Sequence, residues 1–205
     1  MTNLSKIFDF LHLIRDLKTT YRYGAQEREG GVHRDSSADH SWRVAIMVFL
    51  FAEELKLEID IYKAVKIALT HDLVEAIAGD VDYRLIWLKK VSPEDKFKNE
   101  YAAMEKIRGT LPSPAGQEIF DLWLEFEKGT TPEGKFVNAL DKMEGMTHLI
   151  EEGHMTYDVP ESIPRYADQA VADFPALKNA YKIMKEKLKK EFEKGGIEWK
   201  NEYEK

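Results

Sequence analysis

Acidic and imidazole side chains gather in one short stretch of this chain, and their spacing could support proton or metal chemistry. The stretch follows an apolar run, residues 64–69, so the helix expected to carry it should be buried. An ionised carboxylate there needs a partner, because burying it unpaired costs several kcal/mol. On a helix, Glu75 lies on the same side as His71 and Asp72. Gly79 allows a turn that brings Asp80 back toward them. The four residues are His71, Asp72, Glu75 and Asp80.

Two readings of this stretch follow from the residues themselves. The pair His71–Asp72 could be a buried structural ion pair, since satisfied polar pairs occur in protein cores. Alternatively, one cation could join it to His40, near the start of a central helix, and to Asp141, on a later helix. A mixed set of imidazoles and carboxylates with open positions suits Mn, Fe, Co, Ni or Zn better than Ca.

The rest of the chain predicts an all-α fold that could bring these residues together. Ser36 or Ser37, Asp60, Ser92 and Thr131 each stand where a helix N-cap is expected. Residues 21–37 hold several glycines and many charges and are predicted to form a long loop. No strand-length alternation, internal repeat or interdomain linker is apparent. The expected helices span about residues 4–18, 37–55, 60 through the acidic stretch, 93–111, 114–127, 132–152, a short one within 159–174, and 175–194.

Composition bounds the class of protein. The chain has 205 residues, 43% of them hydrophobic and 33% charged, which suits one soluble globular domain. Its net charge of -7 argues against binding polymeric nucleic acid. The absence of cysteine leaves histidine and carboxylates to bind any metal. The longest apolar run, residues 44–52, is about half a membrane span, so no membrane association and a cytoplasmic location are expected.

At the level of motifs the chain resembles a known family. Asp39-His40, the string His71-Asp72-x-x-Glu75-x-x-x-Gly79-Asp80, and Leu140-Asp141-Lys142 resemble the H…HD…D pattern of the metal-dependent phosphohydrolases with an HD domain. The chain looks more narrowly like the 5'-deoxynucleotidases of that family, with the resemblance covering about residues 4–155. It implies a single HD domain over residues 1–205, with the metal site between central helices of a bundle and a C-terminal helical extension at about 160–195.

The resemblance also implies roles for individual residues. His40, His71, Asp72 and Asp141 would bind one divalent ion, which could be Mn, Co, Fe, Ni, Zn or Mg. Glu75 and Asp80 would orient or deprotonate the attacking water, and Arg22 would hold the substrate phosphate. Relatives usually carry a tryptophan after this arginine, whereas here Tyr23 follows it and could line the sugar pocket in its place.

The implied activity is hydrolysis of the 5'-phosphate of deoxyribo- or ribonucleoside monophosphates by a cytoplasmic homodimer. Two alternatives stay open: an HD phosphohydrolase for cyclic nucleotides, guanosine tetraphosphate or nucleoside triphosphates, and a helical module that senses a nucleotide without turnover.

Several site residues also have purely structural readings: Glu75 as an exposed helix carboxylate, Asp80 as a turn residue, and Arg22 as a surface ion pair. The remaining histidines are expected to be structural: His12, His33, His148 and His154.

Overall fold

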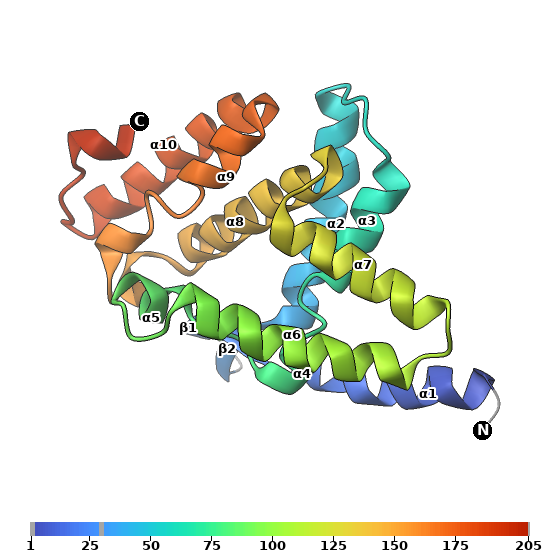
Figure 1. Ribbon diagram of the computed structural model, residues 1–205. Helices are drawn as coiled ribbons and strands as arrows, with labels where there is room; N and C mark the ends of the chain where they lie inside the picture. The colour runs from blue at the N-terminus through green and yellow to red at the C-terminus, as the bar shows by residue number, and fades with distance from the viewer. Residues whose placement is uncertain (1–2, 29–30, 205) are drawn as a thin grey trace.

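Most of the described chain is helical, which confirms the predicted fold class (Figure 1). The computed structural model describes residues 3–28 and 31–204, without the side chains of 25–28 and 31–33, so His33 lies outside the described side chains. None of the helices in this part of the chain is long and apolar enough to cross a membrane. The α-helices are α1 (Asn3–Leu13), α2 (Ser37–Glu54), α3 (Ile61–Thr70), α4 (Glu75–Ala78), α5 (Tyr83–Trp87), α6 (Pro93–Thr110), α7 (Ala115–Lys128), α8 (Pro132–Glu152), α9 (Asp168–Asp173) and α10 (Lys178–Lys194).

Short 3₁₀ turns extend or connect several of these helices. The first predicted helix ends earlier than expected, because the backbone tightens into η1 after Leu13. The last predicted helix likewise opens with a 3₁₀ turn before α10. The helix α5 was not predicted at all. The 3₁₀ turns are η1 (Ile14–Lys18), η2 (His154–Thr156), η3 (Pro160–Ser162), η4 (Pro175–Leu177) and η5 (Asn201–Glu204).

The predicted N-caps explain where the main helices begin. Ser36 caps α2, where its side chain accepts a hydrogen bond from the Asp39 backbone N–H and the Asp39 carboxylate accepts one in return. Asp60, Ser92 and Thr131 cap α3, α6 and α8, and the side chain of each accepts a hydrogen bond from a backbone N–H. Each cap satisfies a donor that has no partner within its helix.

The prediction of a loop over residues 21–37 was wrong. The segment forms an antiparallel hairpin of β1 (Tyr21–Arg28) and β2 (Gly31–Ser36), with an irregular register between Tyr21 and Ala25. Gly24 lies in this irregular part at a φ of 100°, a conformation that favours glycine. The glycines and the interruption in the register hide the two-residue alternation by which a strand is recognised in a sequence.

The third helix also ends earlier than predicted. Instead of carrying His71 and Asp72, α3 stops at Thr70, and residues 71–74 form a tight turn before α4. The Leu73 N–H donates to the Thr70 carbonyl oxygen at 3.2 Å, three residues back rather than four. The Thr70 hydroxyl donates to the Lys66 carbonyl oxygen at 2.8 Å, a local side-chain bond of the kind that perturbs helices.

Two hydrophobic clusters hold this turn in place. Helix α8 runs through the larger cluster, where it packs against α2, α3, α7, α9 and α10 (Figure 1). The smaller cluster lies among α1, α6 and α7, and it includes Leu73 and Val74 from the turn itself. Because Ile67 and Ala68 of α3 belong to the larger cluster, the turn is fixed from both sides. His71 and Asp72 therefore have a defined position relative to α2 and α8.

Candidate active site

Four of the predicted site residues come together although they lie on three separate segments. His40 stands in the first turns of α2, His71 and Asp72 in the turn after α3, and Asp141 in the middle of α8. The Nε2 atoms of the two histidines are 3.4 Å apart, and Asp72 Oδ2 lies 3.2 Å from His71 Nε2 and 3.6 Å from His40 Nε2. Asp141 Oδ1 lies 3.0 Å from His40 Nε2 and 4.0 Å from His71 Nε2.

This cluster fits a metal ion. One ligand atom each from His40, His71 and Asp72 lies within 4.8 Å of the other two, and both imidazoles are buried. Two imidazole nitrogens with carboxylate oxygens form a donor set that first-row divalent metals accept. The arrangement therefore could hold one divalent cation, with Asp141 close enough to join it.

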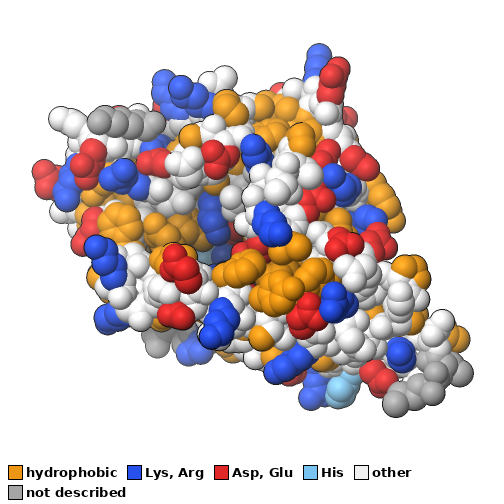
Figure 2. Space-filling view, viewed as in Figure 1, with side chains coloured by type: hydrophobic (Ala, Val, Ile, Leu, Met, Phe, Trp, Pro, Cys, Tyr) orange, Lys and Arg blue, Asp and Glu red, His pale blue; other side chains and the backbone are white. Residues whose placement is uncertain are grey.

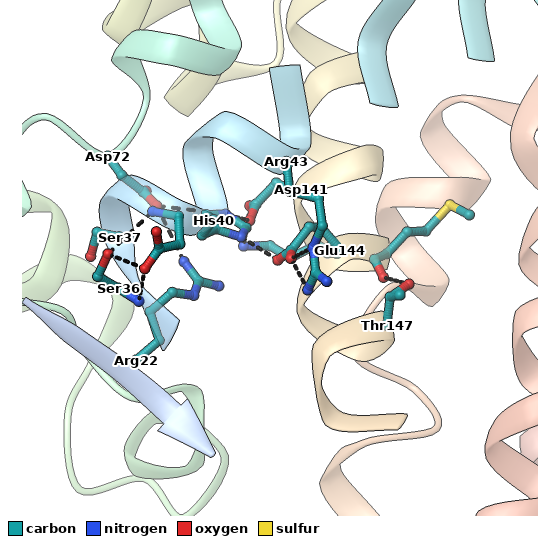
Figure 3. A network of polar contacts seen from close by, with 12 residues as sticks. Arg22, Ser36, Ser37, His40, Arg43, Asp72, Asp141, Glu144 and Thr147 are labelled. Carbon is teal, nitrogen blue, oxygen red and sulfur yellow. Dashed lines mark hydrogen bonds and ion pairs between the residues drawn. The ribbon is translucent and has the colours of Figure 1, made fainter. Parts of the chain in front are cut away.

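Hydrogen bonds on the outer nitrogen of each imidazole orient both rings. His71 Nδ1 lies 2.8 Å from the Ala68 carbonyl oxygen, which leaves Nε2 for the cluster. His40 Nδ1 pairs with the buried carboxylate of Glu144, whose other oxygen pairs with Arg43 (Figure 3). From the sequence, Glu144 was considered only as one of several residues that could support the metal ligands; its position three residues after Asp141 on α8 places both on one face. Such outer partners fix the tautomer of a metal-binding histidine.

The local charges match a site for a cation. Burial opposes ionisation of Asp72, yet His71, His40 and Arg22 hold the pKa of its carboxyl well below the ordinary value. Burial likewise opposes ionisation of Glu144, but His40 and Arg43 lower its pKa to about 2. Both carboxylates are therefore negatively charged beside the imidazoles.

Glu75 and Asp80 lie next to this cluster. Glu75 is the first residue of α4 and is buried, and the Ser37 hydroxyl donates a hydrogen bond to its carboxylate. Gly79 separates the two acids at a φ of 75°, and Asp80 returns to share a hydrogen bond with Glu75. Burial, together with the nearby charges of Asp72 and Asp80, raises the pKa of Glu75. The reading of Glu75 as an exposed helix carboxylate was wrong.

Arg22 and Tyr23 reach the site from strand β1. Arg22 Nη1 lies 3.2 Å from Asp72 Oδ2, with little of either side chain exposed, so Arg22 is not the surface ion pair considered above. Tyr23 makes no contact with the cluster: its hydroxyl pairs with the Thr156 carbonyl oxygen and accepts from the Asp158 N–H at 3.0 Å. The Arg84 guanidinium stacks 3.5 Å from the centroid of its ring.

A cavity extends from Arg22 and Asp80 away from the cluster. Its wall combines Tyr23 and residues 81–84 with part of α8 and with residues near the start of α9. Figure 2 shows one face of the molecule hollowed at a place where basic, acidic and histidine side chains come together beside hydrophobic ones. The site thus offers a concave space beside a potential metal centre, as small-molecule sites do.

A helical fold with paired imidazoles and carboxylates at its centre is the combination that the HD motif predicts. The chain belongs to the HD domain family, whose model matches residues 14–194; this match begins later than the motif resemblance over 4–155 and extends farther toward the C-terminus.

Relatives and solved structures agree with this placement. The chain is 35% identical over 146 residues to the 5'-deoxynucleotidase HDDC2 of Xenopus laevis, covering 71% of this chain and 68% of the relative. It is 36% identical over 154 residues to the 5'-deoxynucleotidase HDDC2 of Dictyostelium discoideum, covering 72% and 78%. The structure resembles a predicted metal-dependent phosphohydrolase from Magnetospirillum magnetotacticum MS-1, with a TM-score of 0.76, 26% identity, and coverage of 95% of this chain and 98% of that one.

Proposed function

We propose that the protein is a metal-dependent phosphomonoesterase that hydrolyses the 5'-phosphate of deoxyribo- or ribonucleoside monophosphates to nucleoside and phosphate. The main support is that the ligand atoms of His40, His71 and Asp72, from two distant segments, converge within 4.8 Å of one another. Arg22 reaches the edge of that cluster, where Nη1 pairs with Asp72, and its planar guanidinium has the geometry to bind a phosphate. The similarity to 5'-deoxynucleotidases supports the choice of substrate.

His40, His71, Asp72 and Asp141 would hold the metal ion in this proposal. When bound, a divalent ion lowers the pKa of a coordinated water and polarises a phosphoryl oxygen. The chain's contribution is to fix the donors beforehand: two imidazole rings are locked by bonds from their outer nitrogens, and both aspartates are ionised. These bonds orient both rings toward the cluster.

Glu144 tests this positioning of the ligands. Replacing it by glutamine removes the charge that pairs with His40 Nδ1, so the dissociation constant for Mn²⁺ is expected to rise about 10- to 100-fold by calorimetry. Glu151→Gln is the matched control, because Glu151 pairs with Arg43 too but touches no imidazole of the cluster. Equal metal affinities of the wild type and Glu144→Gln would show that Glu144 does not orient His40.

The acid pair Glu75 and Asp80 would handle the water. In its ionised form Glu75 accepts the proton that leaves the attacking water, and Asp80, which shares a hydrogen bond with Glu75, fixes the direction of that carboxyl group. The Ser37 hydroxyl also donates a hydrogen bond to the Glu75 carboxylate. Because Glu75 is buried, bulk water does not compete for hydrogen bonds to its carboxylate.

Arg22 would bind the phosphate, and its removal provides another test. Two charge-assisted hydrogen bonds are lost in Arg22→Ala, so KM for a nucleoside monophosphate is expected to rise about 10- to 100-fold. The matched control is Arg34→Ala, which removes the same charge from an exposed residue that lines the outer mouth of the site. Steady-state kinetics of both variants give the comparison. An unchanged KM in Arg22→Ala would contradict the phosphate role.

A nucleotide panel assayed with Mn, Co and Mg tests the function itself. Phosphate release from nucleoside 5'-monophosphates is the expected result, and deoxyribo and ribo pairs measure the selectivity that Tyr23 leaves open. Turnover confined to cyclic nucleotides, guanosine tetraphosphate or triphosphates would identify a different HD phosphohydrolase. A rise in melting temperature with nucleotide but without turnover of any compound would identify a sensing module.

Other features of the protein stay predictions. They are the homodimer, the cytoplasmic location, the lack of polymeric nucleic-acid partners, and the division of a single domain, residues 1–205, into a core at 4–155 and an extension at 160–195.

A further inference from the structure

His148 is a buried histidine that the proposed chemistry does not use. It lies on α8 with 5% of its surface exposed, and it lines the cavity that begins at Arg22. Its Nε2 atom is buried and has no hydrogen-bond partner among the described residues. Buried polar atoms without a partner are rare and costly, so this one requires an explanation. The sequence analysis expected His148 to be an ordinary structural histidine.

Gly24 leaves space beside this nitrogen. A Cβ atom added at Gly24 would lie 2.9 Å from His148 Nε2, closer than real side chains come, and the φ of 100° also disfavours any other residue. Glycine at this position therefore keeps Nε2 from being covered by a side chain of β1. A buried nitrogen without a partner, on a residue that lines a cavity, is suited to a ligand that carries its own polar atom.

The position of His148 along α8 fits the far end of a nucleotide. His148 follows Asp141 by seven residues, two helical turns, so both lie on the same side of the helix. The rise between them is about 10 Å at 1.5 Å per residue. In a nucleoside 5'-monophosphate whose phosphate lies near Asp141, the part that reaches this far is the base rather than the sugar.

The cavity also offers an aromatic wall. The rings of Tyr83 and Tyr166 have centroids 4.4 Å apart at an angle of 56°, and both residues line the cavity, as does Leu149. Gly145 lets Tyr166 approach α8, since a Cβ there would lie 3.3 Å from the Tyr166 ring. Aromatic faces bind nucleobases by stacking, and a nearby polar group can pair with the edge of the base.

We propose that this cavity binds the nucleobase of the substrate, with the Tyr83–Tyr166 pair against its face and His148 Nε2 hydrogen-bonded to a polar atom on its edge. The inference rests on the proposed function and deepens it, because it assigns the binding energy of the base to residues outside the metal cluster. It predicts that substitutions of these residues lower kcat/KM for nucleotides but not for the corresponding sugar phosphate.

The experiment compares the four deoxyribonucleoside 5'-monophosphates with deoxyribose 5-phosphate, which has no base. His148→Phe keeps a buried ring but loses the hydrogen bond, and kcat/KM for the nucleotides is expected to fall about 5-fold. Tyr83→Leu removes one aromatic face from a half-exposed position, with an expected loss of about 10-fold. Neither variant should change kcat/KM for deoxyribose 5-phosphate.

Thr147→Val is the matched control. Thr147 neighbours His148, but its hydroxyl donates to the Met143 carbonyl oxygen, and Figure 3 shows it across α8 from Arg22. This variant should leave both kinds of substrate unchanged. Calorimetry of thymidine binding to the metal-loaded protein gives a second readout, in which the dissociation constant should rise by the same factors in His148→Phe and Tyr83→Leu.

The outcomes separate this inference from the proposed function. Equal losses on nucleotides and deoxyribose 5-phosphate, or no loss on either, would overturn the base-binding role while hydrolysis stands. If the wild type hydrolyses no monophosphate, the proposed function fails, and thymidine binding alone decides: weaker binding in both variants supports the inference, and unchanged binding overturns it. Should His148→Phe fail to fold, Tyr83→Leu decides.

Discussion

Replacing Glu75 with alanine is expected to lower kcat about 100- to 10,000-fold, the range typical of losing a general base, while the protein keeps its metal. The physical reason is the position of the carboxylate: it is buried beside Asp72 but is not among the residues whose ligand atoms converge. Phosphate release from a deoxyribonucleoside monophosphate and the metal content of the purified variant are the two measurements.

Glu75→Gln refines the test. The amide keeps the volume of the side chain and can still accept the hydrogen bond from Ser37, but it cannot take a proton from water. A loss as large as that of Glu75→Ala would assign the effect to proton transfer. If Glu75→Gln retained near-normal activity, or if Glu75→Ala lost its metal, the proposed division between base and ligands would be wrong.

Features that depend on neighbouring residues could be predicted from the sequence. The starts of α2, α3, α6 and α8 follow from cap residues whose oxygen accepts a backbone N–H three positions on. The turn at Gly79, which brings Asp80 back to Glu75, is local in the same sense. The convergence of His40, His71 and Asp72 is not local, and the sequence could indicate it only through the family motif.

Features that depend on distant contacts were missed. The pairing of Glu144 with His40 joins residues 104 positions apart, and nothing near either one in the sequence signals it. The cavity wall combines Tyr83, at the start of an unpredicted helix, with Tyr166 from the proline-containing segment before α9. Such contacts arise from how α8 packs against its neighbours, which periodicity alone does not encode.

The strand pairing was missed for a different reason. In a two-stranded hairpin each strand has only one partner and buries little hydrophobic surface. Its residues therefore need not alternate strongly between apolar and polar. The irregular register around Gly24 interrupts the alternation further. Yet this hairpin carries Arg22 to Asp72 and places Gly24 beside His148, so the least predictable element positions part of the proposed substrate site.

Asp72→Ala is expected to abolish stable metal binding and, with it, phosphatase activity. Asp72 Oδ2 lies within 3.6 Å of both Nε2 atoms, so its removal leaves only the two imidazoles and Asp141, whose Oδ1 lies 4.0 Å from His71 Nε2. The loss of Mn²⁺ affinity should exceed the 10- to 100-fold typical of residues that only orient a ligand. Metal content after dialysis and calorimetric titration measure it.

The control for this variant must separate loss of a ligand from loss of a nearby negative charge. Asp82→Ala removes an aspartate that lines the neighbouring cavity but pairs with Arg84, so its metal content should equal that of the wild type. Asp72→Ala also leaves Arg22 without its carboxylate, so a thermal melt is needed to show that the variant is folded. A folded Asp72→Ala protein that binds Mn²⁺ as tightly as the wild type would mean that the histidines and Asp141 suffice, and that Asp72 serves to hold Arg22.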